Sequence, residues 1–350
     1  MNKRLALVLV PLLIILTACA TTSTGGSSSS QSSSSPSAEL TKLPTGTIGV
    51  LQITAAAESV VRSAATIEKA NTAAGWKTVV TDGKGTPAVM SQAMTDFIAR
   101  GVDAIITIAV DAPLIAPQIE QAKAAGIPVV SAPYGSSDPN HLYTAIFGPS
   151  TDGYIHSMSG YLMKKYPSGA KFVAVDVPAV ATAHEFVVGV ADDLVGASFD
   201  YQGVADADPA DVVNSFTTAT SNILQAHPDT QIMLSCCDFS PPIQERVLQS
   251  MGRQDVLLTG RFDNLSSLAL FETNKNLVLG AANSDRGVLV ALDAIYAHKA
   301  NGTAIPTAND QSVYTFTVID SSNAPATGKF YFDPDEQINE FVAKWTKDYS

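Results

Sequence analysis

The sequence predicts an α/β fold made of two doubly wound parallel-sheet lobes. Short apolar runs alternate with longer amphipathic segments from residue 47 onward. The short runs are apolar throughout, which is typical of strands buried on both faces, and the segments between them are long enough for crossover helices. This alternation occurs in two successive sets without a sequence-level repeat, and about 300 residues suffice for two lobes of ordinary size.

The first set begins with the apolar run Thr47–Ile53, followed by a helical pattern over Ala55–Ala74 that ends at Gly75. Glycine after the last periodic residue is a common helix stop. Further strands are predicted at 76–82, 102–110 and 127–133, and further helices at 87–100 and 112–125.

The second set follows a strand at 142–148 that leads into a predicted crossover. Strands are then predicted at 170–177, 198–204, 230–236, 255–262 and 276–283, and helices at 151–165, 183–196, 209–226, 242–251 and 286–299. In doubly wound sheets, ligands bind beyond the carboxyl ends of the strands. We therefore expect a site among the segments that follow these strands.

The N-terminal segment has the pattern of a secretory signal. Lys3 and Arg4 precede an apolar run, Leu5–Leu16, which is too short to span a bilayer comfortably. The next residues complete LTAC at 16–19, which resembles the lipobox of bacterial lipoproteins, in which the cysteine is acylated and becomes the first mature residue. An uncleaved anchor, or an ordinary signal followed by a chance cysteine, remains the alternative.

The residues after Cys19 are rich in serine and glycine and predict a flexible tether. We therefore expect a lipoprotein signal peptide at 1–18 and a lipidated cysteine with its tether at 19–43. The folded body would then lie at the outer face of the bacterial cell membrane, attached through the lipid.

Composition excludes some classes of function. The formal charge is −12 and would become −14 if Lys3 and Arg4 were removed with the signal, and an acidic protein is a poor match for nucleic acid. After lipidation only Cys236 and Cys237 would remain, so no disulfide framework is expected. No cofactor is expected, and we expect a monomer.

Residues 98–133, IARGVDAIITIAVDAPLIAPQIEQAKAAGIPVVSAP, resemble the type I periplasmic binding proteins, in particular the sugar-binding branch. Further matches are AHPDTQIMLSCCD, GRFDN and RGVLVALDAI, so the resemblance covers roughly residues 46 to 345. It implies two lobes that are joined by crossover segments and close on a small solute. Mapped onto this chain, one lobe comprises 46–148 plus 281–309 and the other 149–280 plus 310–350.

The resemblance also implies a function. The solute, a sugar or a related polar cyclic compound, would pass to an ABC permease driven by a separate ATPase, and the chain has no GxxxxGK[ST] sequence of its own. The alternative is a ligand-sensing subunit for a receptor kinase or chemoreceptor. A lipid-anchored α/β hydrolase is a weaker alternative, because no GxSxG or HExxH motif indicates an enzyme.

Three acidic residues follow predicted strands and are candidate ligands for sugar hydroxyls. Asp263 matches the family's acceptor at the end of GRFD, and Asp111 and Asp238 occupy similar places. Carboxylates suit this role because they accept several hydrogen bonds. Asp111 and Asp238 could equally be helix N-caps, since prolines follow each of them closely.

Four further candidates stand where the chain departs from the family. Tyr134 follows IPVVSAP in place of the usual Asp-Arg and could stack on a sugar ring, or be a half-buried loop residue. Glu58 could accept a hydrogen bond, or be an ordinary first-turn helix acid. His184 is the best polar substitute for an arginine expected in that helix, and Asn283 lies near the position of a late amide ligand. These departures argue against a simple pentose or hexose.

Cys236 and Cys237 allow three interpretations: a metal site, two free thiols or a vicinal disulfide. Metal is disfavoured, because the chain lacks CxxC and its histidines show no ligand spacing. A disulfide would be stable outside the cell and would form a small ring at the end of a strand that faces the site.

Overall fold

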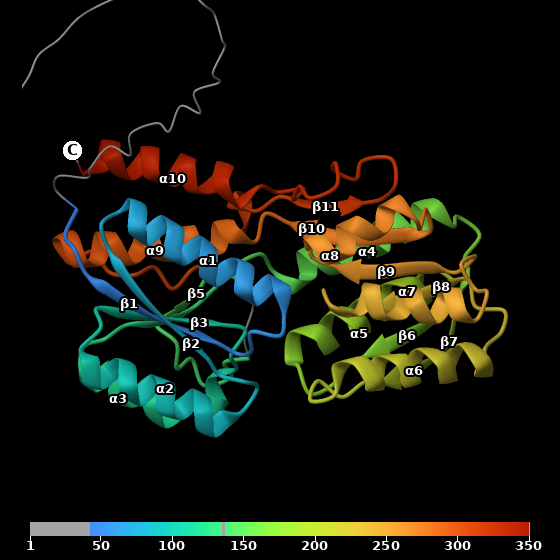
Figure 1. The fold of residues 1–350 in the computed structure, drawn as a ribbon, viewed down its shortest axis with the longest axis horizontal. Coiled ribbons are helices and arrows are strands. Elements are labelled where there is room, and N and C mark those ends of the chain that lie inside the picture. Colours follow the sequence, from blue (N-terminus) through green and yellow to red (C-terminus); the bar gives the residue numbers. More distant parts are fainter. Residues whose placement is uncertain (1–42, 135–136, 350) are drawn as a thin grey trace, which may run out of the picture. The chain divides into compact units, whose positions relative to one another are not determined.

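Two β-sheets covered by helices make up residues 43–134 and 137–349, which the computed structural model describes (Figure 1). The sheets are dominated by parallel pairing, which confirms the predicted fold class. The predicted signal peptide, Cys19 and all but the last residue of the predicted tether lie outside the described residues.

The first sheet has the strand order β2-β1-β3-β4-β5 and is parallel throughout. Its strands are β1 (Thr47–Gln52), β2 (Lys77–Asp82), β3 (Ala104–Ile108), β4 (Val129–Ser131) and β5 (Ala145–Ile146). The helices α1 (Glu58–Ala73), α2 (Pro87–Arg100), α3 (Ala116–Ala124), α9 (Asp285–Asn301) and α10 (Pro334–Asp348), with the short η1 (Ala112–Ile115), cover it. We call this sheet and these helices the first lobe.

The second sheet has the order β11-β10-β9-β8-β6-β7, and only β11 is antiparallel to its neighbour among the described strands. Its strands are β6 (Lys171–Asp176), β7 (Asp200–Asp206), β8 (Ile232–Ser235), β9 (Leu257–Arg261), β10 (Leu277–Ala282) and β11 (Phe316–Ile319). The helices are α4 (Thr151–Lys165), α5 (Ala181–Gly196), α6 (Val212–Ala226), α7 (Ser240–Ser250) and α8 (Leu265–Leu268), with the short η2 (Ala269–Glu272). We call this group the second lobe.

The described chain passes between the lobes through four segments, at 147–150, 283–284, 302–315 and 320–333. The third of these contains η3 (Gln311–Val313). The last segment leads from β11 to α10, and neither of these elements was predicted from the sequence.

Helix α10 packs in the first lobe, whereas residues 310–350 were expected in the second lobe. Its residues Ile338, Phe341 and Trp345 lie in the hydrophobic core formed with α1 and α9. The ring of Trp345 packs against that of Tyr296 with 4.9 Å between centroids. The physical reason is that these apolar residues recur at helical spacing and need an apolar surface, which α1 and α9 provide.

The inner strands of both sheets are buried on their two faces, as the continuous apolar runs indicated. The first lobe has one core cluster on each side of its sheet, with Tyr296 and Trp345 on one side and Met94 and Phe97 on the other. None of the helices in residues 43–134 and 137–349 has the length and apolar character that a bilayer crossing requires.

Candidate functional site

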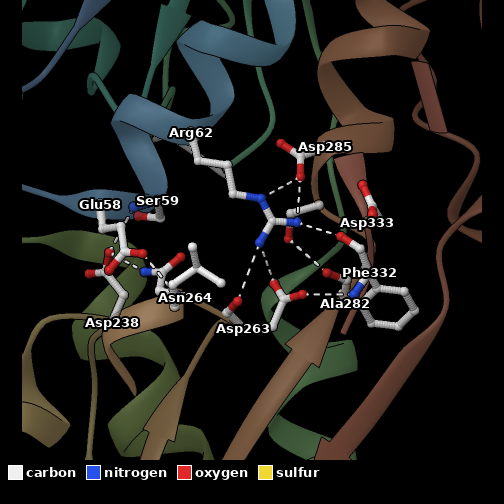
Figure 2. Close-up of polar contacts among 12 residues, drawn as sticks. Glu58, Ser59, Arg62, Asp238, Asp263, Asn264, Ala282, Asp285, Phe332 and Asp333 are labelled. Carbon is white, nitrogen blue, oxygen red and sulfur yellow. Dashed lines mark hydrogen bonds and ion pairs between the residues drawn. The ribbon is translucent and has the colours of Figure 1, made fainter. Parts of the chain in front are cut away.

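One face of helix α1 is polar and is turned toward the second lobe. Ser59, Arg62, Ser63 and Thr66 follow the spacing i, i+3, i+4 and i+7, which places them on the same side of a helix. The hydroxyl-bearing members are 0–4% exposed. Arg62 lies on the same face and extends to the second lobe (Figure 2).

Arg62 joins the two lobes through a network of hydrogen bonds and ion pairs. Its Nη1 lies 2.8 Å from Asp263 Oδ1, and its Nη2 lies 2.6 Å from Asp285 Oδ2. Nη2 also donates to the carbonyl oxygen of Phe332 at 2.7 Å, and the guanidinium lies 4.0 Å from the ring centroid of Phe330. Burial acts to lower the pKa of Arg62, but the two carboxylates outweigh it and hold that pKa above its ordinary value.

Asp263 follows β9, as predicted, and both of its carboxylate oxygens accept hydrogen bonds from the protein. Oδ1 accepts from Arg62 and Oδ2 accepts from the Phe332 backbone N–H at 2.9 Å. Burial raises the pKa of Asp263, and the charge of Arg62 offsets this only in part because Asp285 adds a second negative charge. Asp263 therefore lies at the interface of the lobes, where its predicted role as a sugar acceptor stays a prediction.

Asp238 follows β8 and meets the N-terminus of α1. Its Oδ2 accepts from the backbone N–H of Ser59 at 3.1 Å and from Asn264 Nδ2 at 2.7 Å (Figure 2). A carboxylate at this place is stabilised by the unpaired N–H groups and the positive end of the helix dipole. Asp238 therefore binds the other lobe and does not cap the helix that follows it, α7.

Glu58 makes the reciprocal contact. Its carboxylate accepts from the backbone N–H groups of Leu265 at 2.8 Å and Ser266 at 3.3 Å, and from Ser266 Oγ at 2.6 Å. Glu58 is in the first turn of α1, as anticipated, but it caps the short helix α8 of the second lobe. Each lobe thus offers a carboxylate to a helix N-terminus of the other.

Aromatic side chains fill the space beside these charges. Tyr134 donates from its hydroxyl to the Ser59 carbonyl oxygen at 3.2 Å, and its ring lies 4.9 Å from that of Phe262. The ring of Phe262 also contacts Tyr154 at 5.5 Å. Phe262 has a φ of 71°, a left-handed conformation that bulky residues rarely adopt and that tends to occur at ligand sites.

A small pocket lies against these aromatic side chains. Its walls are formed by residues from both lobes and the first connecting segment, namely Tyr134, Pro149, Thr151, Tyr154, Thr182, Arg261 and Phe262. Its volume is about 10 Å³. This is room for about one water molecule, so this pocket does not hold a monosaccharide in the present arrangement of the lobes.

Three predicted site residues lie apart from this network and have partners of their own. Asp111 accepts from the Ser137 backbone N–H at 2.6 Å. His184 Nδ1 lies 2.5 Å from Asp176 Oδ2, a buried carboxylate of the same lobe. Asn283 has a different role: its side-chain oxygen accepts from the Thr315 N–H at 2.9 Å and joins two connecting segments.

Cys236 and Cys237 form a vicinal disulfide in the structure. Both residues are buried, and the carbonyl oxygen of Cys237 accepts from Ser240 Oγ at 2.9 Å. The disulfide immediately precedes Asp238, so it lies at the end of β8 beside the contact between the lobes. The described residues contain no cluster of three or more metal-binding side chains.

Sequence reasoning did not find Arg62, Arg261 or Asp285. The signal for Arg62 was its position among Ser59 and Ser63 on one helix face, a polar stripe where an apolar one is usual. Arg261 stands inside the GRFD motif, of which only the aspartate was predicted to bind the solute.

Residues 55–271 match the family model of the periplasmic binding protein domain. The ribose import binding protein RbsB of Bacillus subtilis is 26% identical over 213 residues, which are 60% of this chain and 67% of that protein. RbsB of Escherichia coli is 25% identical over 192 residues, which are 53% of this chain and 62% of that protein. The chain therefore spans about two thirds of the first relative's length and less of the second's.

Solved structures resemble the fold over most of the chain. An ABC transporter solute-binding protein from Mycobacterium smegmatis with bound glycerol has a TM-score of 0.69 and 22% identity, covering 83% of this chain and 99% of that one. The Caulobacter myo-inositol binding protein has a TM-score of 0.70 and 18% identity, covering 79% and 94%. The family model spans more than half of the sequence and crosses both lobes, so the chain belongs to the periplasmic binding protein family, with the two-lobed type I fold that its sequence resembles.

Proposed function

We propose that this protein is the solute-binding protein of an ABC importer and captures a sugar or a related small polyol between its two lobes. The observation that carries the proposal is the family match, which covers both lobes and the first connecting segment. The similar proteins support the solute class, since one is a ribose import binding protein and two others hold glycerol or myo-inositol.

The side chains at the closed interface suit such a solute. Glu58, Asp238 and Asp263 supply carboxylate acceptors, and Tyr134 supplies a ring face and a hydroxyl. Because these groups now contact one another, a solute enters only when the lobes separate by bending of the connecting segments. Its hydroxyls then replace some of the contacts between the lobes.

The placement of the protein is part of the proposal. The LTAC sequence at 16–19 supports acylation of Cys19 and a position at the outer face of the cell membrane. From there the protein hands its solute to the membrane permease, which a separate ATPase drives.

The experiment is a thermal-unfolding screen of the purified protein with D-ribose, D-arabinose, D-allose and D-glucose. Each L-enantiomer is the matched control, because it affects the solvent identically but does not fit a chiral site in the same way. A ligand at 100 times its Kd stabilises the folded state by about 2.7 kcal/mol, a rise in Tm of several degrees. Equal melting temperatures with every D and L pair, with no rise on adding D-glucuronate or D-glucose 6-phosphate either, would contradict the proposal.

A further inference from the structure

Arg261, the last residue of β9, is a second buried arginine at the interface, and it lacks the counter-charges that Arg62 has. It is 6% exposed, and its Nη1 donates to the Thr182 carbonyl oxygen at 3.1 Å. Its Nε is buried with no hydrogen-bond partner among the described residues. No described carboxylate forms an ion pair with it, although Arg62 has two.

Aromatic rings surround the guanidinium of Arg261 and only partly replace a counter-ion. Its central carbon lies 4.6 Å from the ring centroid of Phe262, 5.2 Å from Phe186 and 5.5 Å from Tyr154. Burial lowers the pKa of Arg261. The charges of Asp238 and of other groups oppose this lowering from a distance, without a hydrogen bond to the guanidinium. Since arginine stays protonated in proteins, the site holds a buried positive charge with no described carboxylate at ion-pair distance, although Asp238 and Glu185 act on it from farther away.

The N-termini of two helices adjoin the pocket that Arg261 lines. Thr151 and Thr182 also line it, and they belong to the first turns of α4 and α5. Helix N-termini favour anions, because their N–H groups lack partners within the helix and their dipoles are positive there. The side chain of Ser150 caps α4, whereas α5 begins after Val180 with no side-chain cap.

We propose that Arg261 is the partner of an anionic group on the solute, so that the ligand is a polyol with one acidic group, a sugar acid or a sugar phosphate. This inference rests on the proposed function and narrows its solute class. The free edge of the guanidinium can donate two parallel hydrogen bonds to a carboxylate or phosphate. The anion enters when the lobes separate, and closure buries it beside Tyr134, Tyr154 and Phe262.

Matched neutral and acidic ligands test the inference by calorimetry on the wild-type protein. The sets are D-glucose with D-glucuronate, D-gluconate and D-glucose 6-phosphate, and D-galactose with D-galacturonate. We expect an acidic member to bind at least about tenfold more tightly than its neutral parent, the effect of one charge-assisted hydrogen bond. Preference for the carboxylates or for the phosphate identifies the acidic group.

Variants test whether Arg261 causes the tighter binding of the acidic ligand. Arg261→Gln should lower affinity for the acidic ligand about tenfold or more and change affinity for the neutral parent less than twofold. Arg261→Lys keeps the charge but not the paired donors. Its affinity for the acidic ligand should therefore lie between those of the wild type and Arg261→Gln. Arg246→Gln is the matched control, because Arg246 is exposed on α7 of the same lobe.

The outcomes separate the inference from the proposed function. Equal or tighter binding of the neutral sugars by the wild type would overturn the inference and leave the proposed function intact, as would an Arg261→Gln variant with unchanged preference. Absence of binding by every member of every set, together with a negative thermal-unfolding screen, would contradict the proposed function, and the inference would fall with it. The wild-type comparison decides even if the Arg261→Gln variant does not fold.

Discussion

Arg62 of α1 and Asp263 at the end of β9 form an ion pair of 2.8 Å between the lobes, with side chains only 8% and 5% exposed. On the same helix, Lys69 pairs with Asp335 at 2.6 Å, but those side chains are 58% and 57% exposed. The two pairs differ mainly in solvent access, and this difference determines what each contributes to stability.

Replacing Arg62 with glutamine should lower the free energy of unfolding by about 3–5 kcal/mol, because Asp263 and Asp285 would remain buried without their cation. Lys69→Gln is the control from the same helix and should cost less than about 1 kcal/mol. Urea denaturation at neutral pH measures both. Similar losses for the two variants would show that Arg62 does not hold the lobes together as described.

Glu58→Gln should loosen the cap that α1 places on α8. The amide lacks the negative charge and one acceptor oxygen, so the backbone amides of Leu265 and Ser266 should exchange with deuterium about tenfold faster. Glu68→Gln, an exposed change on the same helix, is the control. If amides throughout the second lobe exchanged faster to the same extent as these two, the result would indicate general destabilisation instead of the loss of this cap.

The pKa shift of Asp263 predicts a pH dependence of stability. Burial raises this pKa in the folded state, so the folded protein binds the proton more tightly than the unfolded chain. The contribution of Asp263 to the free energy of unfolding is therefore full below the unfolded pKa of about 3.9 and declines as pH rises through the folded pKa.

Asp263→Asn removes this titration, so the stability of the wild type relative to the variant should fall with rising pH. Denaturant titrations of both proteins between about pH 3.5 and 7 measure the difference. A difference that is constant or grows with pH would show that the pKa is not raised.

Opening the Cys236–Cys237 disulfide should lower solute affinity more than it lowers the Tm of the unliganded protein. The disulfide adjoins Asp238, which contacts Ser59 and Asn264 across the interface, so its loss frees the backbone that positions that carboxylate. Mild reductant is compared with the Cys236→Ser/Cys237→Ser double variant, on which reductant should have no effect. A non-reduced mass spectrum that retains both thiol hydrogens would exclude the disulfide.

Cys19→Ala should release the protein from the membrane fraction and leave the melting temperature of the folded body unchanged. The expectation follows from the LTAC sequence at 16–19 and concerns residues outside those the structure describes. Fractionation of cells that express each form measures it. A variant that remains in the membrane as firmly as the wild type would contradict lipidation.

The sequence predicted elements whose signals are local. Continuous apolar runs such as Ile48–Leu51 indicated buried strands, and Gly101 correctly marked the end of α2, where it adopts a left-handed conformation. Acids after strands, such as Asp238 and Asp263, could also be assigned to one edge of the sheet, because carboxyl ends of parallel strands lie together. β11 was missed, since it is a short antiparallel edge strand with mostly half-buried residues.

Only the tertiary structure decided which distant residues and surfaces of the chain contact one another. The spacing of Ser59, Arg62 and Ser63 shows a polar helix face, but not that Asp263, 201 residues away along the chain, would meet it. The same holds for α10, whose apolar stripe needed a partner surface that could have belonged to either lobe. Periodicity determines which side of an element is buried, whereas the partner depends on how distant surfaces fit together and on which buried charges find counter-charges there.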